Sequence, residues 1–186
     1  MYSPTELKKG TVIQLDGAPF KVIEYSQKVV GRGGSIVNVK LKNLLTGAVI
    51  PKTFKGQDKI EPAEVLSRKV QYLYADGDDF FFMDPETYEQ YQVPLETIGD
   101  AKGFMKESAE LDLQFFNGAI VGNVLPKNMW LEVVRTENVV KGDTTSSVMK
   151  DAELETGLVI KVPAFIKEGD VVSVDTESLS YRERQK

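Results

Sequence analysis

The fold is decided first by residues 11–25, which read TVIQLDGAPFKVIEY. Apolar and polar residues alternate in residues 11–15 and again in residues 20–25. Alternation with a period of two is typical of a strand with one buried face. Asp16-Gly17, between the two runs, is a strong signal for a hairpin turn. The stretch therefore predicts an antiparallel hairpin and favours an all-β fold around it.

The same pattern continues through the first third of the chain. Residues 35–41 and 48–54 again read as strands, with a turn at Thr46-Gly47 between them. Four such strands in about 60 residues indicate a small SH3-like, or KOW-like, barrel. The character of the sequence changes near Glu61-Pro62-Ala63, so we expect a first domain at residues 1–63.

The remaining two thirds predict two further barrels. Short strands are expected at 69–74, 79–83, 88–93 and 110–116, and the only helices expected are short ones between Pro94 and Ser108. This spacing favours a five-stranded OB-type barrel at residues 64–127. After a boundary near residues 126–128, the expected strands are 130–134, 157–163 and 170–175. A second OB-fold barrel at residues 128–186 is the simplest interpretation.

Composition makes an enzyme an unfavoured interpretation. The 186 residues contain no cysteine and no histidine. Thiol chemistry is therefore excluded, and the commonest general base and transition-metal ligand are both missing. We expect no catalytic residue and no metal site. No apolar run approaches the ~18 residues that a membrane span needs, and no signal peptide is recognised, so a cytoplasmic protein without membrane contact is expected.

The charge is distributed unevenly along the chain. Residues 1–63 carry 10 Lys and Arg against 5 Asp and Glu, which gives +5. Residues 64–127 carry 5 against 12, which gives −7, and residues 128–186 carry 8 against 11, which gives −3. A basic first domain followed by acidic ones indicates that the N-terminal region meets a polyanion.

The sharpest local feature is Gly31-Arg32-Gly33-Gly34, between two strand signals. Glycines allow a tight turn that holds Arg32 outward, and a guanidinium suits phosphates and bases. Taken alone, an ordinary hairpin with an exposed arginine is the favoured interpretation. Lys40 and Lys42 should share the solvent face of the following strand, and with Lys52 and Lys55 they are expected to form a stripe. For that stripe, phosphate binding and a merely solvated face remain equally open.

Three other features of the sequence are better explained by structure than by binding or catalysis. The polar loop at residues 141–147 reads as a surface loop. Carboxylates that resemble a metal loop are better explained by turn chemistry; they are Asp76, Asp78 and Asp79. Aromatic residues that could stack on bases are more often core residues at this strand spacing; they are Phe80, Phe81, Phe82, Tyr88 and Tyr91.

Several segments together resemble bacterial elongation factor P. They are the Gly31-Arg32-Gly33-Gly34 loop, KLKNLLTG at 40–47, the Lys141-Gly142-Asp143-Thr144 loop, and KDAELETGLVIKVPAFIKEGD at 150–170. The resemblance covers the whole chain in the right order. It implies three barrels in an L-shaped outline, and a translation elongation factor that works as a monomer. Such a factor binds the ribosome between the peptidyl and exit sites, beside the peptidyl-tRNA, and relieves stalling at consecutive prolines.

The resemblance also implies roles for residues. Arg32 would contact the acceptor end of the tRNA, with Gly31, Gly33 and Gly34 giving the loop its geometry. By the same resemblance, Gly142, Asp143 and Thr144 would lie near the messenger RNA. From their strand positions, Lys40 and Lys42 are further candidates for contact with the RNA backbone.

The loop tip assigns this chain to the arginine type of the family. Some members of this type carry a rhamnose on the arginine, added by an arginine rhamnosyltransferase, and we favour this modification for Arg32. No other cofactor is implied. Val30-Gly31 stands where the lysine types often have Pro-Gly.

Three alternatives stay open from the sequence. One is a paralogue of elongation factor P with the same fold. Another is a generic OB-fold RNA-binding protein, which the acidic middle third argues against. The third is a carboxylate-based hydrolase, for which no paired acid motif is found.

Overall fold

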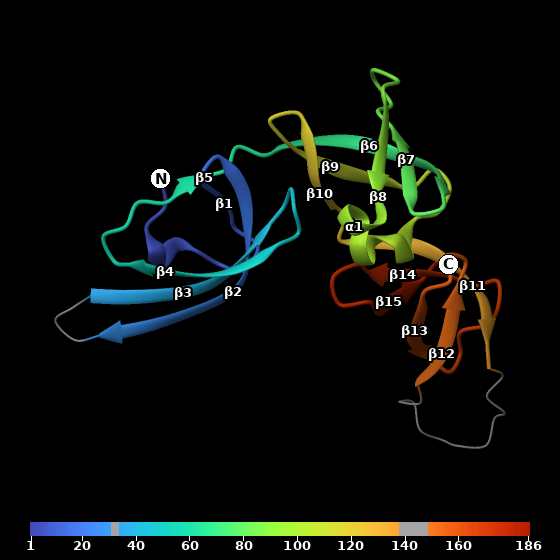
Figure 1. Cartoon of the computed structure of the whole chain (residues 1–186). Helices are drawn as coiled ribbons and strands as arrows, with labels where there is room; N and C mark the ends of the chain where they lie inside the picture. The colour runs from blue at the N-terminus through green and yellow to red at the C-terminus, as the bar shows by residue number, and fades with distance from the viewer. Residues whose placement is uncertain (31–33, 138–148) are drawn as a thin grey trace. The chain divides into compact units, whose positions relative to one another are not determined.

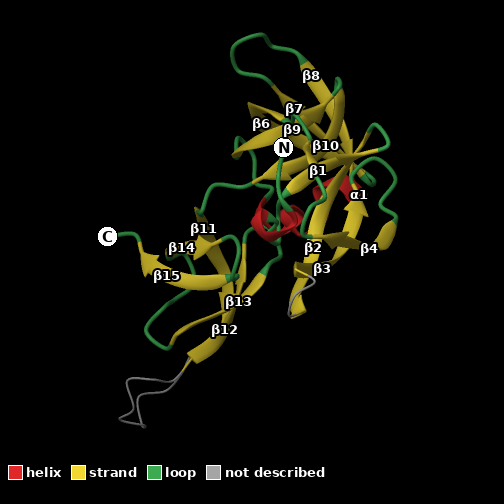
Figure 2. Cartoon of the chain, turned by 90° about the vertical axis from the view of Figure 1, so that its left-hand side faces the viewer, coloured by secondary structure: helices red, strands yellow, loops and turns green. Residues whose placement is uncertain are grey.

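The computed structural model describes residues 1–30, 34–137 and 149–186, and its secondary structure is mainly strand (Figures 1 and 2). Its fifteen strands form three five-stranded sheets, as expected for three small barrels. The helical segments described are short: η1 (Pro4–Glu6), α1 (Leu95–Ile98) and η3 (Gly99–Phe104). No helix among these residues is long and apolar enough to cross a membrane.

The first sheet has the order β4-β3-β2-β1-β5. Its strands are β1 (Val12–Leu15), β2 (Ala18–Val30), β3 (Gly34–Asn43), β4 (Val49–Lys55) and β5 (Glu61–Pro62). The predicted turn joins β1 and β2, with Asp16 and Gly17 both at positive φ (50° and 78°). A buried hydrophobic core covers one side of the sheet. It consists of Leu7, Ile13, Phe20, Val22, Val37, Val39, Leu41, Phe54 and Ile60.

The second sheet has the order β10-β9-β6-β7-β8. Its strands are β6 (Leu66–Asp76), β7 (Asp79–Met83), β8 (Gln90–Pro94), β9 (Glu110–Phe116) and β10 (Ala119–Val124). The alternation of β7 buries Phe80 and Phe82 and leaves Phe81 on the other face. The helices α1 and η3 follow β8, inside the interval in which the sequence predicts them.

The third sheet has the order β13-β12-β11-β14-β15. Its strands are β11 (Asn128–Thr136), β12 (Met149–Leu154), β13 (Val159–Pro163), β14 (Val171–Asp175) and β15 (Ser180–Arg184). The two outermost strands, β13 and β15, also contact each other, which brings the edges of the sheet together as a barrel requires.

By its contacts, the described chain divides into two compact units, residues 1–67 with 114–122 and residues 68–113 with 123–186. Within the second unit, Phe104 and Ala109 belong to the same buried cluster as the core of the third sheet. The hydroxyl of Thr156 donates a hydrogen bond of 2.6 Å to the carbonyl of Gly103. The segment around η3 is therefore packed and hydrogen-bonded against the third barrel.

Candidate nucleic-acid interface

The β2–β3 hairpin extends beyond the rest of its sheet (Figure 1). β2 and β3 pair from Phe20–Asn43 to Val30–Gly34, whereas β1 accompanies β2 only as far as Lys21. On the other side, β4 accompanies β3 only as far as the pair Ile36–Lys55. The distal part is therefore a two-stranded ribbon. Of the predicted tip residues, Gly34 begins β3, while residues 31–33, Arg32 among them, lie outside the described residues.

One face of this hairpin and of β4 points away from the core, and we call it the outer face. Its residues follow from the strand register in four rows across β2, β3 and β4: Lys21, Lys42 and Val49; Glu24, Lys40 and Pro51; Ser26, Asn38 and Thr53; Lys28, Ile36 and Lys55. The face thus carries five lysines and one glutamate. The outer face therefore gathers five of the ten Lys and Arg residues of positions 1–63 on one surface.

A bulge in β2 brings Lys21 onto the outer face. The register between β2 and β3 shifts between Val22 and Glu24, so Ile23 has no direct partner. In a regular strand, residues 21 and 24 would point to opposite sides, because side chains alternate. The extra residue reverses that alternation, as bulges do. Lys21 and Lys28 are members of the basic face that the sequence analysis missed.

The lysines of the outer face differ in how they are neutralised. Lys40 Nζ lies 2.9 Å from Oε1 of Glu24, and both side chains are about half exposed. Lys21, Lys28, Lys42 and Lys55 form no ion pair with any described residue. Four of the five cations are therefore available to an anionic partner without first breaking an ion pair.

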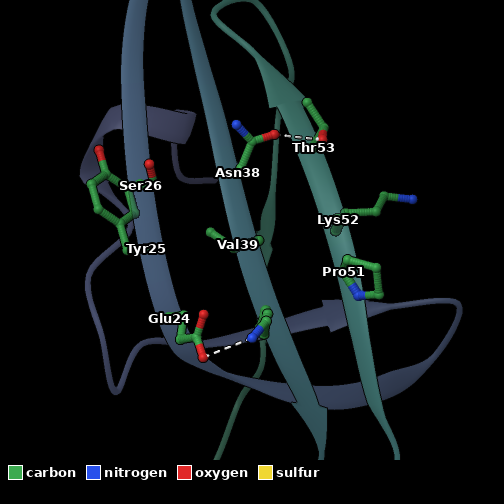
Figure 3. A pocket seen from close by; sticks show the side chains of 9 residues that line it. Glu24, Tyr25, Ser26, Asn38, Val39, Pro51, Lys52 and Thr53 are labelled. Atoms are coloured by element: carbon green, nitrogen blue, oxygen red, sulfur yellow. Dashed lines mark hydrogen bonds and ion pairs between the residues drawn. The ribbon is translucent and has the colours of Figure 1, made fainter.

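Lys52 does not belong with these lysines, contrary to the predicted stripe. Lys52 lies opposite Val39 and Lys55 lies opposite Ile36. The two lysines are three positions apart in a regular strand, so their side chains point to opposite sides of the sheet. Alternation then puts Lys52 on the side of the buried Phe54. Figure 3 shows its side chain pointing away from β3, past the edge of the sheet.

A shallow depression of about 260 Å³ lies over the middle rows of the outer face (Figure 3). Glu24 borders one end of it, with its ion pair to Lys40 drawn as a dashed line. At the other end, the hydroxyl of Thr53 donates a 2.7 Å hydrogen bond to Oδ1 of Asn38. The volume is below the roughly 300–1,000 Å³ of pockets that enclose small molecules. The surface suits an extended polar chain better than an enclosed ligand.

The opposite face of the β2–β3 hairpin carries a chain of side-chain hydrogen bonds. The Tyr25 hydroxyl donates to Oε1 of Gln27 (3.0 Å), and Nε2 of Gln27 donates to Oγ of Ser35 (3.1 Å). The backbone of Ser35 also lies close to Gly56, where an added Cβ would be 3.5 Å away. These contacts join β2, β3 and the residue after β4 close to the described end of the hairpin.

In the third barrel, the predicted loop residues Gly142, Asp143 and Thr144 lie outside the described residues. The strand ends that border this segment are fastened to each other. Lys150 is buried, and its Nζ donates 2.7 Å to the carbonyl of Glu137. The hydroxyl of Thr136 donates 2.8 Å to the carbonyl of Asp151.

The aromatic residues divide between core and surface. Phe80, Phe82 and Tyr91 are buried, as predicted, whereas Tyr88 is 72% exposed. Phe81 stacks on Tyr74 on the outside of the second sheet. Among the described residues, no group of three Asp or Glu side chains is arranged to hold a metal ion, Asp76, Asp78 and Asp79 included.

Comparison with known proteins gives matches along the whole chain. Residues 3–60 match the model of the elongation factor P KOW-like domain, residues 65–123 that of its OB domain, and residues 129–184 that of its C-terminal domain. Elongation factor P of Carboxydothermus hydrogenoformans is 44% identical over 184 residues, covering 99% of this chain and all of that protein. Elongation factor P of Nitratidesulfovibrio vulgaris is 42% identical over 185 residues, covering both chains completely.

A solved structure supports the fold. Eukaryotic translation initiation factor 5A from Methanococcus jannaschii matches with a TM-score of 0.50 and 24% identity, over 66% of this chain and 92% of that chain. At this level of identity, the likeness concerns the arrangement of the strands.

Proposed function

Because the chain belongs to the elongation factor P family, we propose that it binds the ribosome between the peptidyl and exit sites, beside the peptidyl-tRNA, and relieves stalling at consecutive prolines. Members of this family are translation factors rather than enzymes, and they need no cofactor. The observation that carries the proposal is the outer face, where four lysines have no ionic partner among the described residues. Three of them lie on the hairpin that leads to Arg32, and Lys55 lies beside it on β4.

In the proposed complex, the outer face lies along the phosphate backbone of the tRNA acceptor arm. Lys42, Lys21 and Lys28 supply cations without losing an ion pair, and Lys40 joins them when it leaves Glu24. Each phosphate that is neutralised releases counterions, so binding should weaken steeply with salt. The lysines give position and affinity but no sequence specificity. That suits a factor that must act on many different peptidyl-tRNAs.

Arg32 would reach furthest toward the acceptor end of the tRNA. Its guanidinium can donate two parallel hydrogen bonds to a phosphate or stack on a base. Gly31, Gly33 and Gly34 would let the backbone approach without side chains in the way. The ribosome supplies the catalysis, and the factor lowers the entropic cost of aligning the reacting ends. A few kcal/mol is enough, because each ~1.4 kcal/mol changes a rate tenfold.

The other parts of the chain have supporting roles in this proposal. Gly142, Asp143 and Thr144 would lie near the messenger RNA in the exit site. The described residues on either side of this segment are tied together by the hydrogen bond from Lys150 to the carbonyl of Glu137. Domains bounded at residues 1–63, 64–127 and 128–186 are supported by the gaps between β5 and β6 and between β10 and β11. The protein would work as a monomer in the cytoplasm, where ribosomes are.

We further propose that Arg32 carries a rhamnose added by an arginine rhamnosyltransferase. The support is the arginine at the loop tip, which resembles the arginine type of the family. Intact-mass analysis of the native protein tests this directly: the peptide containing Arg32 should be heavier by one deoxyhexose. An unmodified peptide from native material would contradict the modification and leave the role of the guanidinium itself open to the next test.

The function is tested with Arg32→Ala in a reconstituted translation system. The expected result is loss of rescue on a template with consecutive prolines and no effect on a template without them. Lys59→Ala is the matched control, because Lys59 is an exposed cation of the first sheet's domain outside the outer face. If Arg32→Ala rescues as well as the wild type, the assigned role of Arg32 is wrong.

A further inference from the structure

An aromatic pair is exposed on the second barrel. The rings of Tyr74 on β6 and Phe81 on β7 stack with centroids 4.7 Å apart and planes 17° apart. Tyr74 is 52% exposed, although its neighbours Phe80 and Phe82 fill the core on the other side of the sheet. The core therefore does not require this pair, and the stacked rings present an apolar platform to solvent.

Two carboxylates lie next to the platform on the same face. Tyr74 pairs with Phe81, and two residues farther along the hairpin Asp76 pairs with Asp79. Since side chains alternate, both pairs point to the same side of the sheet. Like charges directly opposite each other in adjacent strands are destabilising. Neither carboxylate forms an ion pair with a described residue, so the hairpin bears an unfavourable charge pair that it does not neutralise itself.

The other residues of the rows around the platform are uncharged, and Lys69, two residues before Gln71 on β6, is paired with Glu110 at 3.8 Å. On its third strand, β8, Gln92 lies opposite Phe81 and Pro94 opposite Asp79. The row before the platform holds Gln71, Met83 and Gln90. We call these nine residues the platform face. Its charge comes from Asp76 and Asp79 alone, and it belongs to the third of the chain with a net charge of −7.

The third barrel also places an aromatic ring beside a carboxylate, and there an arginine of the chain contacts both. There, the guanidinium of Arg184 lies 5.7 Å from the ring centroid of Phe165, which is 58% exposed. The same guanidinium is 3.5 Å from a carboxylate oxygen of Asp170. A ring and a carboxylate thus hold one arginine between them. On the platform face, the rings and carboxylates are present and the described chain provides no arginine.

We propose that the platform face binds an arginine-bearing segment of a basic protein. A guanidinium stacks on an aromatic ring and pairs with a neighbouring carboxylate at the same time, which a lysine does less well. RNA is the less suitable occupant, because its phosphates would be repelled by Asp76 and Asp79 and the face offers no cation to hold them. This surface is additional to the tRNA contact of the first sheet and independent of it.

The test uses the full-length protein labelled with nitrogen-15 and two probes, an arginine–glycine repeat peptide and an oligouridine RNA. The arginine peptide should shift the amide signals of residues 74–81 selectively, and less so as salt is added. Asp76→Asn with Asp79→Asn should weaken binding about tenfold, which corresponds to ~1.4 kcal/mol. Tyr74→Ala should weaken it by a similar factor.

Matched controls separate recognition from general acidity and from misfolding. Glu96→Gln with Asp100→Asn removes the same charge from two exposed positions in α1 and η3 and should leave the affinity within about twofold. Tyr88→Ala removes an exposed ring that is outside the platform face. The two Asp→Asn changes keep side-chain size, so their spectrum should stay that of a folded protein. The proposal is overturned if the peptide shifts other residues instead, if both charge-removal variants lose affinity equally, or if the RNA binds residues 74–81.

Discussion

Lys40 Nζ lies 2.9 Å from Oε1 of Glu24, across the β2–β3 pairing in the second row of the outer face. Glu24 is the one acidic residue of the outer face, and its ion pair with Lys40 competes with the contact that Lys40 would make to a tRNA phosphate. Glu24→Gln should therefore strengthen tRNA binding at low salt. The slope of log affinity against log salt should steepen by about 0.7–0.9, the value of one added phosphate contact.

Thermal stability separates this effect from a change in the fold. An exposed ion pair contributes at most about 1 kcal/mol, so Glu24→Gln should melt close to the wild type. Glu61→Gln is the control: it removes one negative charge from the short strand β5, which is outside the outer face. If both variants steepen the salt slope equally, net charge and not the position of Lys40 governs binding.

Lys21 and Lys42 oppose each other across β2 and β3. Two cations in this arrangement repel, and cross-strand pairs are worth roughly 0.2–1 kcal/mol. Lys21→Gln should therefore raise the stability of the first barrel by a few tenths of a kcal/mol and, at the same time, weaken tRNA binding. Denaturation and salt-dependent tRNA binding measure the two effects on the same sample.

The opposite signs are the useful feature of Lys21→Gln, because a residue with a merely structural role would not lose binding while gaining stability. Lys59→Gln removes one charge outside the outer face. It should change the stability of the barrel and the affinity for tRNA only by the small general effect of one charge. A Lys21→Gln variant that binds tRNA with an unchanged salt slope would remove Lys21 from the interface.

The hairpins were predictable from the sequence because their signals are local. Asp16-Gly17 marks its turn by residue type, and the alternation on either side gives the strands that the structure contains. The bulge at Ile23 was not predictable, because a register shift depends on the partner strand and leaves no mark in residue alternation. Lys21 was therefore assigned to no face, and the basic surface was underestimated.

Strands with charged residues were also missed. In β12, Lys150 occupies an inward position opposite Val162 and is 7% exposed. A lysine there breaks the apolar alternation that identifies a strand, and only the carbonyl of Glu137, which tertiary structure brings within 2.7 Å, makes its burial tolerable. β15, which includes Arg182 and Arg184, was missed for the same reason: its charges are satisfied by Asp175 and Asp170 from other parts of the barrel.

The hydrogen bond from the Thr156 hydroxyl to the carbonyl of Gly103 joins η3 to the third barrel. Thr156→Val keeps the shape and removes the donor. It should destabilise the third barrel by about 0.5–1.5 kcal/mol, the net contribution of a hydrogen bond. Trp130, the chain's single tryptophan, lies on β11, so its fluorescence reports the unfolding of this barrel in urea. Thr97→Val is the control, because the Thr97 hydroxyl bonds to no described residue. Its free energy of unfolding should stay within about 0.5 kcal/mol of that of the wild type. Equal unfolding of both variants would show that the joint depends on packing alone.

Asp175 gives the third barrel a defined response to acid. Its carboxylate accepts hydrogen bonds from the backbone N–H of Ser178, from the guanidinium of Arg182 and from the Ser178 hydroxyl. These donors favour the charged form and hold the pKa of Asp175 well below its ordinary value of 3.8. Since the folded-state pKa is the lower one, the unfolded state binds the proton first. The stabilisation is therefore complete above about pH 5 and is lost progressively as the pH falls through 3.8 and below.

Asp175→Asn should remove that dependence. At pH 7 the variant should be less stable than the wild type in urea, with Trp130 fluorescence as the readout, because the ion pair to Arg182 is lost. The difference should shrink steadily below pH 4, as the wild type takes up the proton that the variant cannot bind. Glu183→Gln removes one negative charge from an exposed position on β15 and should keep a constant offset from the wild type. If the gap between Asp175→Asn and the wild type is the same at pH 7 and pH 3, the stabilisation comes from the shape of the side chain and not from its charge.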